Sequence, residues 1–287
     1  DMGMTGTLPC LNKRGVEFAI RVCHALHMEI DELLCFDRKN YYYSDLPKGF
    51  QITQDKRPIG RNGYLMIEVD GEEKRIDIER LHMEEDTAKQ LHLTDYSLID
   101  YNRAGIPLIE IVTNPCIRSG KEASAYLEAL RQVFLYTEVS DAKLEEGSMR
   151  CDVNVSIRPF GQEAFGTRTE IKNLNSISNV QKAIDYEAGR QQEVIESGGE
   201  VLQETRRYDE VEKVTTVMRS KGDAVDYKYY TEPNILPIRL DHAWVERIKN
   251  ELPMMAGERE KHYEEEYGIP KVDAKILVST KSMSDYF

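Results

Sequence analysis

Two glutamates interrupt the apolar faces of two segments that alternation predicts to be β-strands. Glu85 continues the face of Leu81 and Met83. Glu110, 25 residues later in the chain, lies on a face that is otherwise aliphatic: Ile106, Leu108 and Val112. A carboxylate directed at a core is costly unless a cation or several donors meet it. The pair therefore indicates one shared divalent cation such as Mg²⁺ in a cleft. The alternative is that Glu110 lies between two apolar faces and pairs with an arginine.

A second group of polar residues alternates along residues 149–158. One face of this predicted strand is apolar, and the other carries cations, a carboxylate, an amide and a hydroxyl: Arg150, Asp152, Asn154, Ser156 and Arg158. The next predicted strand, residues 166–172, adds Arg168, Glu170 and Lys172 in its polar phase. Paired antiparallel, the two strands would form a polar floor that holds triphosphate oxygens and a metal. A solvated sheet face with cross-strand ion pairs is the alternative.

Weaker signals lie beside these two groups. His82 could be a ligand or a base, although a solvated or hydrogen-bonded histidine is the simpler interpretation. Residues 37–43 could offer Lys39 to a phosphate and tyrosine rings to a base, or could be a plain strand edge. The sequence has no glycine-rich phosphate loop, so any ATP site is of neither the Walker nor the Rossmann type.

The elements that must position these residues can be read from hydrophobic periodicity. Helices are expected at residues 13–28, 119–136, 176–197, 241–252 and 257–267. Strands are expected at residues 41–43, 64–69, 74–79, 81–86, 106–112, 149–158, 166–172 and, as a pair, 204–218. Asp70-Gly71 supplies a tight hairpin turn. Hairpins interrupted by single long helices predict an α+β fold with a mostly antiparallel sheet. Residues 1–240 would form the main core, and residues 241–287 its helical C-terminal part.

Composition limits the class of protein. The 287 residues carry a formal net charge of −13, which disfavours binding of nucleic acid through a broad basic surface. No apolar run approaches the roughly 20 residues that span a bilayer, so no membrane partner and a cytoplasmic location are expected. Five cysteines without C-x-x-C spacing indicate reduced thiols. Both ends are expected to be cut, because the chain opens without an initiator methionine and stops without a closing element.

Seven motifs resemble signatures of one known family, the B subunits of the glutamyl/aspartyl-tRNA amidotransferases. Four lie in the first part of the chain: Phe36-Asp-Arg-Lys-Asn-Tyr-Tyr-Tyr43, Arg80-Leu-His-Met-Glu-Glu-Asp86, Asn102-Arg-Ala-Gly-Ile-Pro-Leu-Ile-Glu-Ile-Val112 and Leu144-Glu-Glu-Gly-Ser-Met-Arg-Cys-Asp-Val-Asn154. Three follow: Glu170-Ile-Lys-Asn-Leu-Asn175, Gln203-Glu-Thr-Arg-Arg207 and Asp226-Tyr-Lys-Tyr-Tyr230. They run in the family's order across nearly the whole chain, so the resemblance is specific.

The resemblance implies an activity, cofactors and partners. Members of this family use ATP and Mg²⁺ to phosphorylate the side-chain carboxylate of Glu-tRNA(Gln) or Asp-tRNA(Asn). Ammonia from a glutaminase A subunit then displaces the phosphate. The implied partners are the A and C subunits and the mischarged tRNA. The implied core resembles the glutamine synthetase/guanido kinase fold, which agrees with the predicted antiparallel sheet.

The resemblance also implies residue roles. It makes Glu85 and Glu110 metal ligands and catalytic residues, with Asp152 as a further acidic catalytic partner. Lys39, Ser148 and Arg150 match positions suited to nucleotide phosphates.

The chain departs from the family at both ends. The family's opening Gly-Leu-Glu-Val-His segment, which bears a further metal-site histidine, is not in this sequence, nor are the helical and tail domains that help hold tRNA. The fragment alone is therefore expected to be inactive. Two other interpretations stay open: a stand-alone ligase of the glutamine synthetase type, which would act on free glutamate without tRNA, and a non-catalytic scaffold subunit, which would bind neither nucleotide nor Mg²⁺.

Overall fold

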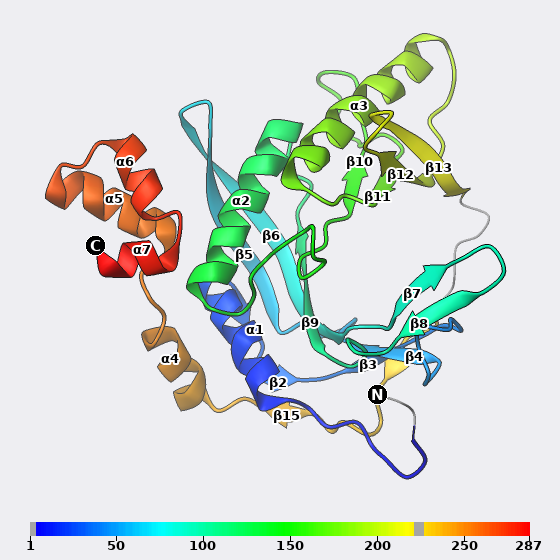
Figure 1. Cartoon of the computed structure of the whole chain (residues 1–287), viewed down its shortest axis with the longest axis horizontal. Helices are drawn as coiled ribbons and strands as arrows, with labels where there is room; N and C mark the ends of the chain where they lie inside the picture. Colours follow the sequence, from blue (N-terminus) through cyan, green and yellow to red (C-terminus); the bar gives the residue numbers. More distant parts are fainter. Residues whose placement is uncertain (1–3, 221–226) are drawn as a thin grey trace. The chain divides into compact units, whose positions relative to one another are not determined.

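The structure is a computed structural model that describes residues 4–220 and 227–287, with the side chains of residues 219 and 220 excepted. Runs of mostly antiparallel strands are separated by single helices, and a series of helices follows the last strand, which confirms the predicted α+β class (Figure 1). Asp226, the first residue of the last tyrosine-rich motif, lies outside the described residues. Among the described residues, no helix is both long enough and apolar enough to cross a bilayer.

The five helices expected from periodicity are present, with ends shifted by at most a few residues. The helices are α1 (Lys13–Ala25), α2 (Gly120–Tyr136), α3 (Ile177–Glu196), α4 (His242–Asn250), α5 (Ala256–Tyr267), α6 (Lys271–Leu277) and α7 (Lys281–Tyr286). Hydroxyl caps define two of the starts, because Ser119 accepts a hydrogen bond from the Glu122 amide and Ser176 accepts one from the Asn179 amide. The short helices α6 and α7 were not predicted.

Two four-stranded sheets carry most of the β-structure. The first has the order β1 (Glu29–Ile30), β5 (Gly60–Val69), β6 (Glu72–Glu85) and β9 (Pro107–Thr113). The second has the order β10 (Val153–Val155), β11 (Thr169–Lys172), β12 (Glu204–Asp209) and β13 (Val214–Ser220). The β11–β12 pair is parallel, whereas the other pairings whose direction is defined are antiparallel.

Three smaller sheets complete the architecture. They are β14 (Tyr230–Thr231) with β3 (Asp37–Asn40) and β4 (Phe50–Thr53), β15 (Ile238–Arg239) with β2 (Leu33–Leu34), and β7 (Lys89–His92) with β8 (Ser97–Asp100). The predicted hairpin turn joins β5 to β6, and both of its central residues have the positive φ that such a turn requires, 53° at Asp70 and 87° at Gly71.

Two strand predictions need correction. Residues 41–43 do not form a strand: β3 ends at Asn40, and a turn in which the Leu46 amide donates to the Tyr43 carbonyl reverses the chain. The strand expected at residues 149–158 is confined to Val153–Val155, and its partner begins only at Thr169. The Met149 amide donates to the Lys143 carbonyl within the preceding loop, and residues 149–152 lie outside the ladder.

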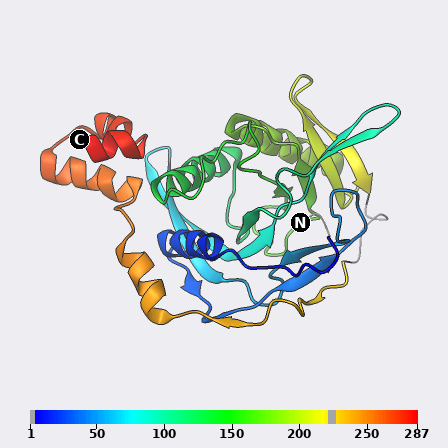
Figure 2. The same ribbon diagram turned by 60° about the horizontal axis from the view of Figure 1, so that its bottom comes forward.

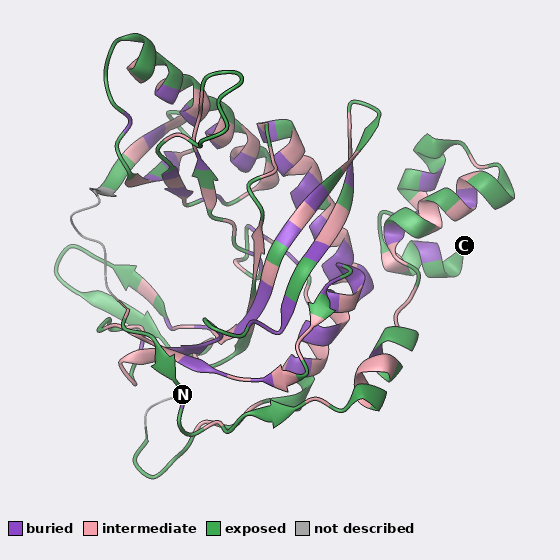
Figure 3. Ribbon diagram, turned by 180° about the vertical axis from the view of Figure 1, so that it is seen from behind, coloured by how far each residue is buried: buried purple, intermediate pink, exposed green. Residues whose placement is uncertain are grey.

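The chain divides into two compact units, each built from separate stretches of sequence. Unit 1 comprises residues 1–65, 76–115 and 225–278, and unit 2 comprises residues 66–75, 116–224 and 279–287. In unit 2, α2 and α3 lie side by side (Figures 1 and 2), and α3 also contacts β10 and β13. In unit 1, the core residues include one face of α1 and much of β6, which are purple in Figure 3.

The end of α1 lies directly against β5 because two glycines of that strand leave room for it. A Cβ atom at Gly60 would lie 2.6 Å from Cys23 Sγ, and one at Gly63 would lie 2.6 Å from the Leu26 carbonyl oxygen. That carbonyl is fixed, since it accepts a 2.8 Å hydrogen bond from the Tyr64 amide. Close approach of this helix end therefore depends on glycine at residue 63.

We predict that Gly63→Ala lowers the free energy of unfolding by about 1–3 kcal/mol, because the added methyl overlaps a backbone oxygen that cannot move away. Gly257→Ala, in a helix with open space around the site, is the matched control and should leave stability unchanged or raise it by up to about 1 kcal/mol. Urea denaturation measures both. Equal stability of the two variants would contradict this account of the α1–β5 contact.

Candidate functional site

The register between β6 and β9 decides which acidic residues face one another. His82 lies opposite Glu110, and Glu85 lies opposite Pro107. Residues directly opposite in an antiparallel pair project from the same face, and neighbours along a strand project from opposite faces. His82, Glu84 and Glu110 therefore share one face of the sheet, and Glu85 projects from the other.

This arrangement corrects the sequence-based prediction that Glu85 and Glu110 lie together on one apolar face. The alternation within each strand was identified correctly, but the cross-strand register, which determines the shared face, is not visible in either strand alone. Glu110 is also far from buried, since 52% of its side chain is exposed.

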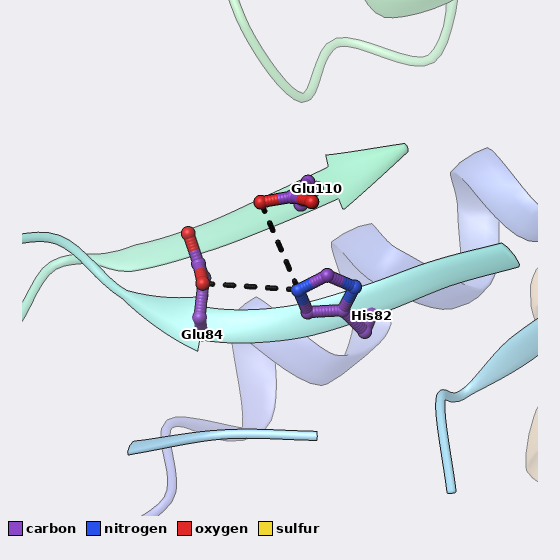
Figure 4. A group of neighbouring side chains, drawn as sticks. All are labelled: His82, Glu84 and Glu110. Carbon is purple, nitrogen blue, oxygen red and sulfur yellow. Dashed lines mark ion pairs between the residues drawn. The ribbon is translucent and has the colours of Figure 1, made fainter. Parts of the chain in front are cut away.

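Glu110 instead meets His82 and Glu84 (Figure 4). The Nε2 atom of His82 lies 3.7 Å from Glu84 Oε2 and 3.9 Å from Glu110 Oε2. One ligand atom from each of the three residues lies within 4.8 Å of the others. Two ligand atoms bound at about 2.1 Å to one Mg²⁺ are at most about 4.2 Å apart. The cluster therefore needs only a small inward movement to hold a divalent cation.

Burial favours a cation at this cluster. His82 is buried, and its Nδ1 atom has no hydrogen-bond partner. Glu84 is nearly as enclosed, with 11% of its side chain exposed. Two carboxylates beside one imidazole repel each other unless a proton or a metal ion stands between them. Carboxylate oxygens suit Mg²⁺, and an added imidazole nitrogen is compatible with Mn²⁺.

Glu85 has a different set of partners on the opposite face. Its Oε1 atom accepts a hydrogen bond from Lys48 Nζ at 2.5 Å and one from the Ile52 amide at 2.9 Å. Both side chains of the ion pair are largely enclosed, with 16% of Lys48 and 13% of Glu85 exposed. The carboxylate thus ties β4 and the preceding loop to the end of β6, which is a structural contact.

Lys39 lies among tyrosine rings that come from distant parts of the chain. Its Nζ atom is 4.7 Å from the centroid of the Tyr227 ring and 5.8 Å from that of Tyr41. Tyr41 and Tyr229 each lie edge-on to Tyr227, with ring centroids 5.6 and 6.1 Å apart. An ammonium group held against aromatic faces keeps its charge available for an anionic ligand.

Two of these tyrosines have phenol groups with a raised pKa. Burial raises the pKa of Tyr229 to about 12, and nearby negative charges that include Glu110 and Glu84 add to the increase. Burial also raises the pKa of Tyr41, and the negative charges of Asp45, Glu84 and Glu85 contribute to the increase. Both phenols therefore stay neutral near pH 7.

The polar residues predicted at residues 148–172 belong to unit 2. Val153 pairs with Ile171 and Asn154 with Glu170, which confirms the antiparallel pairing. The Lys172 ammonium lies 2.8 Å from Asp152 and 3.3 Å from Glu170. Burial alone would lower the pKa of Lys172, but these carboxylates outweigh it and raise the pKa.

Only part of the predicted floor is a sheet face, because Arg150 and Asp152 precede β10 and lie outside its ladder. Arg150 and Asp152 are exposed, and 38% of the Lys172 side chain is exposed. Ser148 is also exposed, and its hydroxyl contacts Asp141 and accepts a hydrogen bond from the Lys143 amide. Of the predicted site residues, Lys39, Glu85 and Glu110 thus belong to unit 1. Ser148, Arg150 and Asp152 belong to unit 2.

Sequence reasoning missed Glu84 and the contact of the distant Tyr227 with Lys39, although it did place the neighbouring Tyr41 there, and it treated His82 as a weak signal. Glu84 was not predicted as a site residue because it shares a strand face with His82, and a face of polar residues is ordinary for a strand that borders solvent. The spacing of these two residues, with one residue between them, was the available signal, since it directs both side chains to the same side. Nothing near Lys39 in the sequence indicates that Tyr227 will contact it.

Comparison with known proteins gives consistent results. The model of the GatB/GatE catalytic domain family matches residues 1–246. The chain is 55% identical over its whole length to the B subunit of the aspartyl/glutamyl-tRNA(Asn/Gln) amidotransferase of Staphylococcus aureus strain MRSA252. It is 54% identical over its whole length to the same-named protein of Staphylococcus saprophyticus. It covers 60% of the length of each of these relatives.

We predict that Glu85→Gln lowers the free energy of unfolding by about 1–3 kcal/mol, because the enclosed Lys48 ammonium loses its charged partner. Glu110→Gln should change stability by less than about 0.5 kcal/mol, since its side chain is half exposed. Thermal or urea denaturation at pH 7 compares the two isosteric changes. A larger loss for Glu110→Gln than for Glu85→Gln would overturn the roles assigned to the two faces of the sheet.

Proposed function

The chain belongs to the GatB/GatE catalytic domain family, and on that premise we propose that it forms the catalytic part of a tRNA-dependent amidotransferase subunit. The proposed reaction is the ATP-dependent amidation of Glu-tRNA(Gln) and of Asp-tRNA(Asn), the two substrate types in the relatives' name. The proposed catalytic part is residues 1–240, supported by the family match to residues 1–246. We further propose that its core is of the glutamine synthetase/guanido kinase type.

The proposed chemistry has two steps. A side-chain carboxylate oxygen of the aminoacyl group attacks the γ-phosphorus of ATP, the bond to the β-phosphate oxygen breaks, and ADP leaves. Ammonia then attacks the carbonyl carbon of the acyl phosphate, loses a proton, and expels inorganic phosphate with the electron pair of the C–O bond. A glutaminase A subunit would supply the ammonia, and a C subunit would complete the assembly.

The cluster of His82, Glu84 and Glu110 would hold the divalent cation of this reaction. It combines donor atoms whose spacing suits one small cation with two like charges that require neutralisation. When bound, the ion would neutralise charge on the triphosphate oxygens. This set replaces the pair Glu85 and Glu110, because Glu85 lies on the opposite face and pairs with Lys48.

Candidate phosphate-binding residues occur in each unit taken by itself. In unit 1, the Lys39 ammonium would contact phosphate oxygens, and the rings of Tyr41, Tyr227 and Tyr229 offer faces for the base. In unit 2, Ser148 and Arg150 are proposed phosphate contacts, and Asp152 a further acidic catalytic residue that Lys172 orients. The exposure of Ser148, Arg150 and Asp152 supports these roles.

One observation carries the proposal: one ligand atom from each of His82, Glu84 and Glu110 lies within 4.8 Å of the others, in a chain with 55% identity to an amidotransferase subunit. A scaffold subunit needs no such cluster. A stand-alone ligase would amidate free glutamate, so an assay without tRNA separates that activity from the proposed one.

We predict that Glu110→Gln, in the enzyme assembled with its partner subunits, lowers ATP-dependent amidation of Glu-tRNA(Gln) by about a hundredfold or more. The substitution keeps the size of the side chain but removes a charge that would hold the cation. Glutamine hydrolysis by the partner subunit should continue. The control is Glu32→Gln, a change in a glutamate whose side chain is 83% exposed, which should leave amidation unaffected.

Two further measurements separate loss of the cation from loss of folding. Binding of Mn²⁺, followed by electron paramagnetic resonance, should weaken in Glu110→Gln and in Glu84→Gln but not in Glu85→Gln. The melting temperature of Glu110→Gln should match that of the unsubstituted enzyme. Normal amidation by a normally folded Glu110→Gln enzyme would remove Glu110 from the site.

A further inference from the structure

The loop between β10 and β11 exposes two phenylalanines beside arginine. The Phe160 side chain is fully exposed, and Phe165 is 54% exposed. The Arg158 guanidinium lies 4.7 Å from the centroid of the Phe165 ring. Exposed aromatic rings offer flat faces on which a ligand can stack. We call residues 156–168 the aromatic loop.

Local interactions define the conformation of the aromatic loop. Gly161 has a φ of 86°, and the Gln162 amide donates to the Pro159 carbonyl at 3.1 Å. The Gln162 side chain donates to the Ala164 carbonyl at 2.9 Å. A Cβ atom at Gly166 would overlap the carbonyl oxygen of Ile157, so the two arms of the loop lie in close contact. The rings are therefore presented on a preorganised turn rather than on a featureless linker.

Charge distinguishes the partners that this loop could bind. The whole chain has a net charge of −13, yet the ionisable side chains of the aromatic loop are Arg158, Glu163 and Arg168, a local excess of one positive charge. An arginine stacked on a phenyl ring beside a second exposed ring offers flat faces and a cation together. This combination suits single-stranded nucleic acid, because its bases stack on aromatic faces and its phosphates bind guanidinium groups.

We propose that the aromatic loop stacks bases of the unpaired 3′ end of the tRNA, with Phe160 and Phe165 as the stacking surfaces and Arg158 and Arg168 next to the backbone phosphates. The inference rests on the proposed function, which supplies a substrate whose reacting group is attached to a single-stranded RNA end. Stacking does not depend on the identity of the base, so the loop would serve Glu-tRNA and Asp-tRNA equally. Its role would be in substrate binding.

The test uses the assembled enzyme and two uncharged tRNA transcripts, one intact and one lacking its last four nucleotides. The variant is Phe160→Leu/Phe165→Leu, which keeps apolar bulk and removes both π faces. Dissociation constants are measured at one fixed salt concentration, because phosphate contacts make them salt-dependent. The control is Val211→Ala, which truncates an 84% exposed apolar residue at the β12–β13 turn of the same unit.

The unsubstituted enzyme should bind the intact transcript about tenfold more tightly than the truncated one, since a base stacked on an aromatic ring contributes roughly 5- to 150-fold. The leucine variant should lose that preference, binding both transcripts within about twofold of each other. Its melting temperature and its affinity for ATP should be unchanged. Val211→Ala should behave as the unsubstituted enzyme does.

Several results would overturn the inference. A leucine variant that still prefers the intact transcript tenfold excludes stacking by this loop. Equal weakening for both transcripts places the contact elsewhere on the RNA. The leucine variant could instead release a partner subunit, while the fraction that stays assembled binds tRNA normally. That result would make the loop a protein-docking surface. If the unsubstituted enzyme amidates tRNA, any of these results refutes the loop assignment and leaves the proposed function standing. If it neither binds nor amidates tRNA, the proposed function fails and the loop assignment fails with it.

Discussion

The pairing of β6 with β9 imposes the central electrostatic constraint on this protein. The ladder holds Glu84 and Glu110 on one sheet face beside a buried imidazole whose Nδ1 atom lacks a hydrogen bond. Backbone hydrogen bonds fix the strands, so the carboxylates can separate only by side-chain rotation. A small cation removes the repulsion more effectively than rotation does, because it replaces one unfavourable interaction by two favourable ones. The site is thus built by the register of a sheet rather than by a loop that closes on a ligand.

Adjacent glutamates of the same strand have opposite environments. Glu84 belongs to the face that gathers acidic groups, whereas Glu85 belongs to the face where Lys48 neutralises it. Because neighbouring side chains of a strand alternate between faces, Glu84 is suited to metal binding while the next residue, Glu85, anchors the strand. The anchored carboxylate fixes the end of β6, and through it the position of its neighbour. Precise placement of ligand groups generally depends on such supporting contacts.

Much of the fold followed from local patterns in the sequence. The 3.6-residue period located α1, α2 and α3, and Asp70-Gly71 located the longest hairpin, because both signals depend on residues that are close in sequence. The functional site was less predictable, since its geometry depends on contacts between distant segments. Alternation identified Glu110 as unusual but could not reveal that its partner across the ladder is His82. The position of Tyr227 over Lys39 results from the pairing of β14 with β3, which no local signal encodes.

The discontinuous make-up of unit 1 has a consequence for the order in which the protein can fold. The strand β14 pairs Tyr230 with Arg38, and β15 pairs Ile238 with Leu34, although almost the whole of unit 2 separates these partners in the sequence. During synthesis, the residues of β2 and β3 therefore leave the ribosome long before their partners exist. Contacts of such high sequence separation form slowly, because a long loop must close before they contribute any stability. Unit 2, apart from its last nine residues, can complete its contacts earlier. The surroundings of Lys39 are consequently among the last parts of the molecule to become native, since Tyr227 can reach the Lys39 ammonium only after almost all of unit 2 has been synthesised.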